Sequence, residues 1–182
     1  MIDPAGHHVV VRGGGDLGSG VIWRLRRVGF PIVVLELERP LTVRRTVAYS
    51  SAITDGRITI DGIEGRRVST PGEAAGVARD GVVAVLAAAD LPSFPTRPSV
   101  VVDARLAKQT LDTTIDQAPF VVGLGPGFSA GTDCDAVVET MRGHRLGRVI
   151  WEGPAAPNTG VPGEIGGASG DRVLRADGTG TL

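Results

Sequence analysis

Short apolar runs separated by polar and glycine-rich segments mark the first part of the chain. The runs at 9–11 and 32–36 show no alternation of apolar and polar residues, which is typical of strands buried on both faces of a parallel sheet. Between them, apolar residues recur with helical spacing over 16–28 (Leu17, Val21, Ile22, Leu25 and Val28). Strand, helix and strand fit within about 30 residues, the size of a βαβ unit. The pattern therefore predicts an α/β domain on a parallel sheet.

The rest of the chain extends this pattern. Further strands are predicted at 82–86, 100–102, 120–124 and 148–151. Helices are predicted at 70–78 and 133–142, and a hairpin at 57–68. We expect residues 1–152 to form one α/β domain, a Rossmann-like open parallel sheet with helices on both faces and a small β-hairpin insertion. Residues 153–182 are a Gly/Pro-rich C-terminal tail.

Composition and charge narrow the function classes. The net charge of −1 indicates no general affinity for nucleic acid or for an anionic membrane. No apolar run reaches the roughly 18 residues of a membrane span, and the N-terminus lacks the layout of a signal peptide. Cys134 is the single cysteine and histidines are not clustered, so neither a disulfide nor a metal site is expected. We expect a cytoplasmic protein, and a homo-oligomer is compatible with these features.

The loop Gly13–Gly18 carries the first candidate site. It matches G-x-G-x-x-G between a predicted strand and a predicted helix, through Gly13, Gly15 and Gly18, with Gly14 also in the loop. Glycines let backbone N–H groups approach a phosphate, and the helix N-terminus favours negative charge. Glu36 ends the second strand, where a ribose-binding carboxylate is expected.

Asp16 argues against ordinary dinucleotide binding at this loop. We expect its carboxylate to cap the helix start and to repel a pyrophosphate. The loop is then either a site for a nucleotide or another anion, or a self-capped turn that only packs the helix on the sheet.

A second glycine loop follows the strand at 120–124. Gly123, Gly125 and Gly127 repeat the order of strand, loop and predicted helix, and Ser129 and Thr132 add hydroxyl groups. Loops after parallel strands open on one edge of the sheet, so both glycine loops are expected to line one crevice. The alternative is a tight crossover in which a hydroxyl merely caps the helix.

Candidate chemistry outside the glycine loops is limited. Asp103 ends a predicted strand and begins a charged segment that also holds Arg105, Lys108, Asp112 and Asp116. Asp103 and Lys108 are candidate catalytic residues, or members of a solvated loop. Cys134 is a third candidate if it lies at a helix start, and an inert residue if it is buried. Arg44 and Arg45 are candidates for binding an anionic substrate, or are surface arginines.

Seven sequence blocks, in order along nearly the whole chain, resemble the YqeB family of selenium-dependent molybdenum hydroxylase accessory proteins. They are 10–16 (VVRGGGD), 38–47 (ERPLTVRRTV), 102–108 (VDARLAK), 123–128 (GLGPGF), 139–144 (ETMRGH), 157–160 (PNTG) and 162–167 (PGEIGG). The resemblance implies an accessory role in maturing molybdenum hydroxylases such as xanthine dehydrogenase. It assigns no catalytic residue. Family members look longer at the C-terminus, so the tail is expected to begin a further small β-domain.

Three functions therefore stand beside one another. The first is an accessory protein that binds a nucleotide-bearing or anionic ligand, such as NAD(P) or a molybdenum-cofactor dinucleotide, and acts on a molybdenum hydroxylase. The second is an NAD(P)-dependent oxidoreductase. The third is a non-catalytic scaffold. Fold alone does not choose among them.

Overall fold

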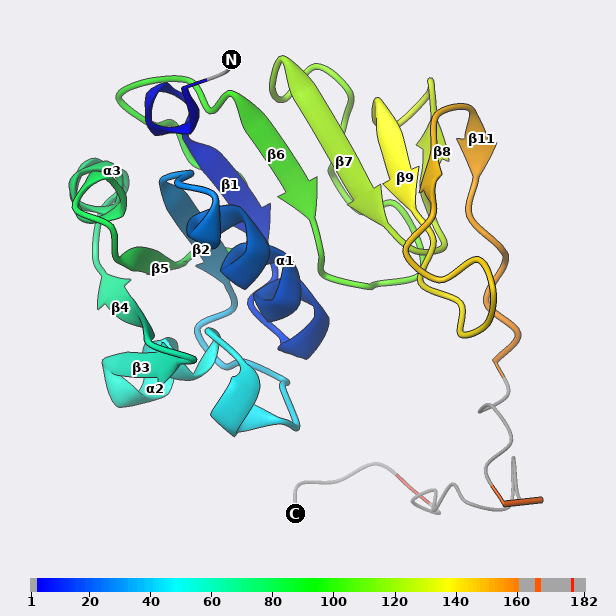
Figure 1. Cartoon of the computed structure of the whole chain (residues 1–182), viewed down its shortest axis with the longest axis horizontal. Helices are drawn as coiled ribbons and strands as arrows, with labels where there is room; N and C mark the ends of the chain where they lie inside the picture. The colour runs from blue at the N-terminus through cyan, green and yellow to red at the C-terminus, as the bar shows by residue number, and fades with distance from the viewer. Residues whose placement is uncertain (1–2, 161–165, 168–177, 179–182) are drawn as a thin grey trace.

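The computed structural model describes residues 3–160, 166–167 and 178 (Figure 1). Its helices are α1 (Asp16–Arg27), α2 (Ser51–Asp55) and α3 (Pro71–Arg79), with 3-10 turns at Pro4–Gly6 and Arg45–Val47. Its strands are β1 (Val9–Arg12), β2 (Ile32–Glu36), β3 (Arg57–Ile60), β4 (Ile63–Val68), β5 (Val83–Ala87), β6 (Val100–Asp103), β7 (Phe120–Leu124), β8 (Ser129–Ala130), β9 (Ala136–Val138), β10 (Val149–Ile150) and β11 (Gly153–Pro154). No helix in this described part is long and apolar enough to span a membrane.

Nine strands form one sheet in the order β10-β9-β7-β6-β1-β2-β5-β4-β3. The six strands from β9 to β5 are mutually parallel and follow the strand order of a Rossmann fold. The predicted hairpin is β3–β4, and it extends this sheet because β4 pairs with β5 in parallel. The predicted α/β class is confirmed.

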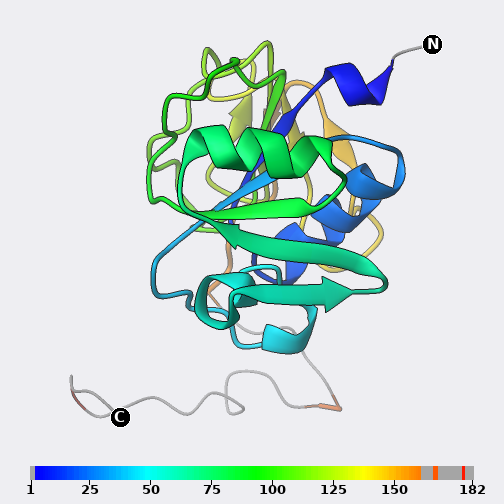
Figure 2. The ribbon, with the colours of Figure 1, turned by 90° about the vertical axis from the view of Figure 1, so that its left-hand side faces the viewer.

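Helices lie on both faces of the sheet, as predicted. Ile22 of α1 and Ile53 of α2 belong to one buried cluster, which includes Val11 of β1. Ala74 of α3 belongs to a second cluster, which includes Val10. Neighbouring strand residues point to opposite faces, so the two clusters are the two sides of the sheet. Figure 2 shows α3 running along β5.

The half of the sheet formed by β6, β7 and β9 is built differently. Between residues 104 and 135, all described, the crossovers contain no helix. Phe128, Ala130 and Ala155 cover this part of the sheet instead, and β8 and β11 pair as a small antiparallel ribbon. Because β11 lies at 153–154, the start of the predicted tail packs against the α/β domain. Residues 161–165, 168–177 and 179–182 of that tail, which include most of the 162–167 block, lie outside the described residues.

The helix predicted at 133–142 is wrong. Asp135 bonds twice to Val121: its N–H donates to the Val121 carbonyl at 2.8 Å, and its Oδ2 accepts the Val121 N–H at 2.7 Å. These bonds align the following residues with β7, and Ala136–Val138 forms the parallel strand β9. A carboxylate that bonds the backbone of another segment competes with helix formation, and the two β-branched valines of β9 favour a strand.

The buried stripe of α1 is narrower than predicted. Leu17 and Val28 are 51% and 61% exposed, and the buried residues of α1 are Gly18, Ser19 and Ile22. Small residues at 18 and 19 let the helix backbone approach β1 closely, which turns Leu17 away from the sheet.

Candidate functional site

A cavity of about 980 Å³ opens at the carboxyl ends of β1, β2 and β6. From β1 the chain builds the sheet in one direction through β2 and β5, and in the other through β6, β7 and β9. The boundary between β1 and β6 is therefore the topological switch point, where open α/β sheets bind their ligands. We call this cavity the main cleft. Its walls are formed by the first glycine loop and by residues 35–37, 41–44, 88–90, 104–107 and 111–112.

Three glycines of the first loop are required by packing within the protein. A Cβ on Gly13, whose φ is +96°, would lie 2.9 Å from the carbonyl oxygen of Ala104. A Cβ on Gly14 would lie 2.9 Å from the backbone nitrogen of Ser50. A Cβ on Gly18 would lie well inside 3.0 Å of the Gly13 carbonyl oxygen, a separation that Cβ atoms essentially never show. Close packing of the loop against its neighbours therefore accounts for these three glycines, and they do not by themselves indicate a ligand.

Gly15 differs from the other glycines of the loop. A Cβ there would come no closer than 3.7 Å to any atom, the nearest being Thr42 Oγ1, and its φ of −65° is open to any residue. Gly15 is the N-cap of α1 and lines the main cleft. Nothing in the described structure demands a glycine here, whereas close approach of a phosphate to the backbone does.

Asp16 does not cap α1, contrary to prediction. Among the described residues no side chain caps this helix, and the Asp16 carboxylate instead forms an ion pair with Arg44. The guanidinium of Arg44 offsets the negative charge that was expected to repel an anion. Asp16 and Arg44 both line the main cleft, whereas Arg45 begins a 3-10 turn and does not.

Glu36 lies in the main cleft, at the end of β2. Its Oε2 accepts the N–H of Gly14 at 2.9 Å, and its Oε1 accepts the N–H of Leu37 at 2.8 Å. A carboxylate has about four acceptor positions, so these two bonds orient Glu36 without exhausting it. The structure therefore places Glu36 at the end of β2 and on the wall of the main cleft, and its role toward a ribose stays a prediction.

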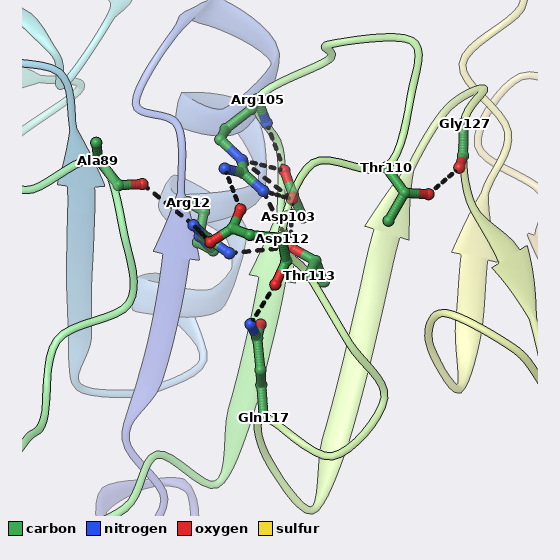
Figure 3. A network of polar contacts seen from close by, with 9 residues as sticks. All are labelled: Arg12, Ala89, Asp103, Arg105, Thr110, Asp112, Thr113, Gln117 and Gly127. Atoms are coloured by element: carbon green, nitrogen blue, oxygen red, sulfur yellow. Dashed lines mark hydrogen bonds and ion pairs between the residues drawn. The ribbon is translucent and has the colours of Figure 1, made fainter.

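A network of charged side chains, from buried Arg12 and Asp103 to partly exposed Arg105 and Asp112, forms the floor of the main cleft (Figure 3). Arg12 ends β1 and is 1% exposed, and its register partner on β6 is Asp103, also 1% exposed. Arg105 donates to Asp103, and Thr113 donates to Asp103 Oδ2 at 2.6 Å. Arg12 donates to Thr113 Oγ1 at 3.1 Å and to Asp112 at 2.6 Å. Two arginines and two aspartates thus compensate one another at the switch point.

Sequence reasoning placed Asp103 at this edge but missed Arg12 and Thr113. The signal for Arg12 was available: residues 9–12 read VVVR and residues 100–103 read VVVD. An apolar strand that ends in a charged residue places that charge at the carboxyl edge, and two such strands as neighbours would place opposite charges side by side. Thr113 lies in an irregular loop and left no comparable signal.

The second glycine loop does not line the main cleft. A Cβ on Gly125 would collide with Thr140, and one on Gly127 with the backbone of Gln109, so both glycines are required by internal packing. Pro126 and Lys108 line a smaller neighbouring cavity of about 230 Å³. The two loops open on the same edge of the sheet but line different cavities, so the expectation that both line one crevice is wrong.

The other predicted residues of this region are dispersed. Gly123 packs against the ring of Phe128, Ser129 pairs with Pro154 in the β8–β11 ribbon, and Thr132 is exposed at a turn. Cys134 is fully buried, and burial raises the pKa of its thiol. The helix N-terminus that would have favoured its thiolate is absent from residues 131–140. Within the described residues, no three His, Cys, Asp or Glu side chains are grouped to hold a metal ion.

Glu139, 3% exposed, ties the residues after β11 to the sheet. Its Oε1 accepts the N–H of Met141 at 2.7 Å, and its Oε2 accepts the N–H of Ala156 at 2.8 Å. Burial opposes ionisation of this carboxyl, but these backbone bonds outweigh burial and lower its pKa below the ordinary 4.5. The stabilisation from Glu139 is therefore present above its unfolded-state pKa and is lost as the pH falls through its folded-state pKa.

We expect Glu139→Gln to lower the free energy of unfolding by about 1–3 kcal/mol at neutral pH, because the amide of glutamine faces a backbone donor. The difference from the native chain should shrink as the pH falls below about 4. Urea unfolding at several pH values measures it. A difference that stays constant down to acid pH would contradict the role of the ionised carboxylate.

The fold and the main cleft define this chain as a Rossmann-like α/β domain with a glycine loop and paired arginines at the switch point. It is 47% identical, over 183 residues, to a protein of Escherichia coli (strain K12) named uncharacterized protein YqeB. The alignment covers 98% of this chain and 34% of YqeB, so the chain spans about a third of its relative's length. The chain is thus a relative of YqeB, which supports the resemblance seen in the sequence blocks. No family model and no solved structure matches it.

Proposed function

We propose that this chain is the ligand-binding part of a cytoplasmic accessory protein for the maturation of a molybdenum hydroxylase, of the selenium-dependent, xanthine dehydrogenase type. Its ligand is a nucleotide-bearing anion bound in the main cleft, such as a molybdenum-cofactor dinucleotide. The accessory role rests on the resemblance to the YqeB family. The binding role rests on the geometry of the cleft.

The observation that carries the binding role is Gly15. Among Gly13, Gly14, Gly15 and Gly18, it is the one position at which the protein itself would accommodate a Cβ. It lies at the start of a 12-residue helix that has no side-chain cap, on the wall of the main cleft. A phosphate at this position would receive backbone N–H groups and the favourable end of the helix dipole. The cleft volume of about 980 Å³ suits a ligand of dinucleotide size.

We expect Gly15→Ala to weaken nucleotide binding by about tenfold or more, a loss of about 1.4 kcal/mol. The added methyl group would occupy the space that a phosphate needs. The free energy of unfolding should change by about 1 kcal/mol or less, because alanine is only a somewhat poorer N-cap than glycine. Calorimetric titration with ATP, CTP, NAD and NADP, and with the cytosine dinucleotide form of the cofactor, measures the affinities.

Gly72→Ala is the matched control for this experiment. Gly72 also lies in the first turn of a helix, α3, and a Cβ there would meet nothing within 4 Å. Its substitution should leave every affinity unchanged. If the native chain binds none of these compounds at millimolar concentration, the proposed ligand class is wrong.

The maturation role is tested in cells. Deleting the gene should leave a molybdenum hydroxylase that is made but has lost activity, and the Gly15→Ala chain should restore that activity less well than the Gly72→Ala chain. A deletion strain whose hydroxylase is fully active and fully loaded would remove the accessory role.

NAD(P)-dependent hydride transfer is a second candidate because Glu36 ends β2 at the position that recognises a ribose in dehydrogenases. It makes a separate prediction: NAD or NADP should raise the melting temperature of the native chain, and Glu36→Ala should abolish that increase. A response to CTP or to the molybdenum-cofactor dinucleotide without any response to NAD(P) decides against the oxidoreductase.

A further inference from the structure

Asp112 occupies the space between two guanidinium groups on the floor of the main cleft. Its Oδ2 accepts from Arg12 Nη2 at 2.6 Å, and its Oδ1 accepts from Arg105 Nη1 at 2.7 Å (Figure 3). Two arginines that each donate to a different oxygen of one group form the arrangement that holds phosphate or carboxylate ligands. Here the anion is supplied by the chain itself.

The two aspartates of the network are not equivalent. The side chain of Asp103 is buried, lies at the end of β6, and accepts from both Arg105 and Thr113. The side chain of Asp112 is 39% exposed and belongs to the irregular segment between β6 and β7. Gln117 donates to the backbone carbonyl of Asp112 at 2.7 Å, so its backbone is held independently of its carboxylate. The carboxylate of Asp112 can therefore move away from the two guanidinium groups while the other side chains of the network keep their positions.

The charges favour a replacement anion when Asp112 leaves. Arg12 and Arg105 carry two positive charges, and Asp103 compensates one of them. Arg12 is buried and cannot turn its guanidinium to bulk water, and its Nε has no hydrogen-bond partner in the described structure. A buried positive charge without its counter-charge costs several kcal/mol, which binding of an anion would offset. Arg12, Arg105 and Asp112 all line the main cleft.

We propose that Arg12 and Arg105 form an oxyanion subsite, filled by Asp112 in the unliganded protein, at which a phosphoryl group exchanges with the Asp112 carboxylate. The subsite rests on the proposed function in that it shares the main cleft, but its residues are separate from Gly15 and the start of α1. The phosphoryl group belongs either to free inorganic phosphate or to the terminal phosphate of a nucleotide in the cleft.

The test is Asp112→Asn, which keeps the shape of the side chain and removes its charge. In chloride buffer this variant should melt below the native chain. Inorganic phosphate, compared with chloride at equal ionic strength, should raise its melting temperature and should bind at least about tenfold more tightly than to the native chain. Equal phosphate affinity for the two proteins would overturn the proposal.

Two further variants locate the effect. Adding Arg105→Gln to Asp112→Asn should abolish the phosphate response, whereas adding Arg44→Gln, which removes an exposed arginine of the same cleft, should leave it intact. If the Arg44 change abolishes the response and the Arg105 change does not, the anion binds at the start of α1 and the subsite is refuted.

The glycine loop separates this proposal from the proposed function. Asp112→Asn with Gly15→Ala should lose affinity for CTP and keep its phosphate response, because the subsite does not include Gly15. A CTP affinity that Asp112→Asn leaves unchanged assigns the subsite to free phosphate. A response to CTP that is stronger in Asp112→Asn than in the native chain, and lost with Arg105→Gln, assigns the subsite to a nucleotide phosphate. If no nucleotide binds the native chain but Asp112→Asn still binds phosphate, the proposed function fails and the subsite stands. If adding Gly15→Ala to Asp112→Asn abolishes the phosphate response, the subsite is refuted.

Discussion

Gly18→Ala is expected to lower the free energy of unfolding by about 3 kcal/mol or more. The added Cβ would collide with the carbonyl oxygen of Gly13, and that oxygen belongs to a backbone held in the sheet edge rather than to a flexible side chain. Relief requires α1 to move away from β1, which opens the packing around Ile22. For a domain of this size the loss corresponds to a fall in melting temperature of about 10 °C, measurable by calorimetry.

Gly20→Ala is the control for that prediction. Gly20 lies in the same helix, two residues further on, and a Cβ there would meet nothing within 4 Å. Alanine favours the helix, so this variant should gain about 0.5–1 kcal/mol. Equal destabilisation by the two substitutions would mean that α1 does not approach β1 as closely as described.

Asp103→Ala should be comparably damaging, with an expected loss of about 3–5 kcal/mol. The substitution leaves the buried Arg12 and the partly buried Arg105 with only the partly exposed Asp112 between them. It also removes the acceptor of the Thr113 hydroxyl. A further consequence is that anions should stabilise this variant more than the native chain. Urea unfolding in chloride and in phosphate at equal ionic strength measures both effects.

Asp16→Ala provides the comparison for Asp103→Ala, because Asp16 also pairs with an arginine. That partner, Arg44, has a side chain 68% exposed, and an exposed ion pair contributes at most about 1 kcal/mol. The two variants remove the same chemical group and differ in burial. If they destabilise the protein equally, the switch-point network contributes no more than a surface pair.

Local patterns in the sequence were sufficient for the first half of the sheet. The strands at 9–12 and 32–36 and the helix between them each show their pattern of apolar residues within a short window, so that pattern alone reveals them. The error at 133–142 has a long-range cause, because the residue that sets the local conformation is Asp135 and its partner, Val121, lies on another strand. Nothing within that window could have shown the pairing.

In the candidate site, too, residues set by local patterns could be predicted and residues set by long-range contacts could not. The glycine loop was found because it follows directly after a strand, and Glu36 because it ends one. The pairing of Arg12 with Asp103 depends on β1 and β6 being neighbours, although they are separated by almost 90 residues of chain. Thr113 and Asp112 reach the network through an irregular segment, for which no periodic pattern exists. Local patterns in the sequence could therefore predict the glycine loop and Glu36 on the wall of the cleft. They could not predict the charge network on its floor.

The order of the strands also has a consequence for self-association. The edge strands are β10, which offers two residues, and β3, which offers four and begins with Arg57. A very short edge strand such as β10, or one that begins with a charge such as β3, is a poor template for pairing with the unpaired N–H and C=O groups of another chain. Edge-to-edge stacking of sheets is therefore disfavoured at both ends, and copies of this domain that assemble would have to meet through side chains on another surface.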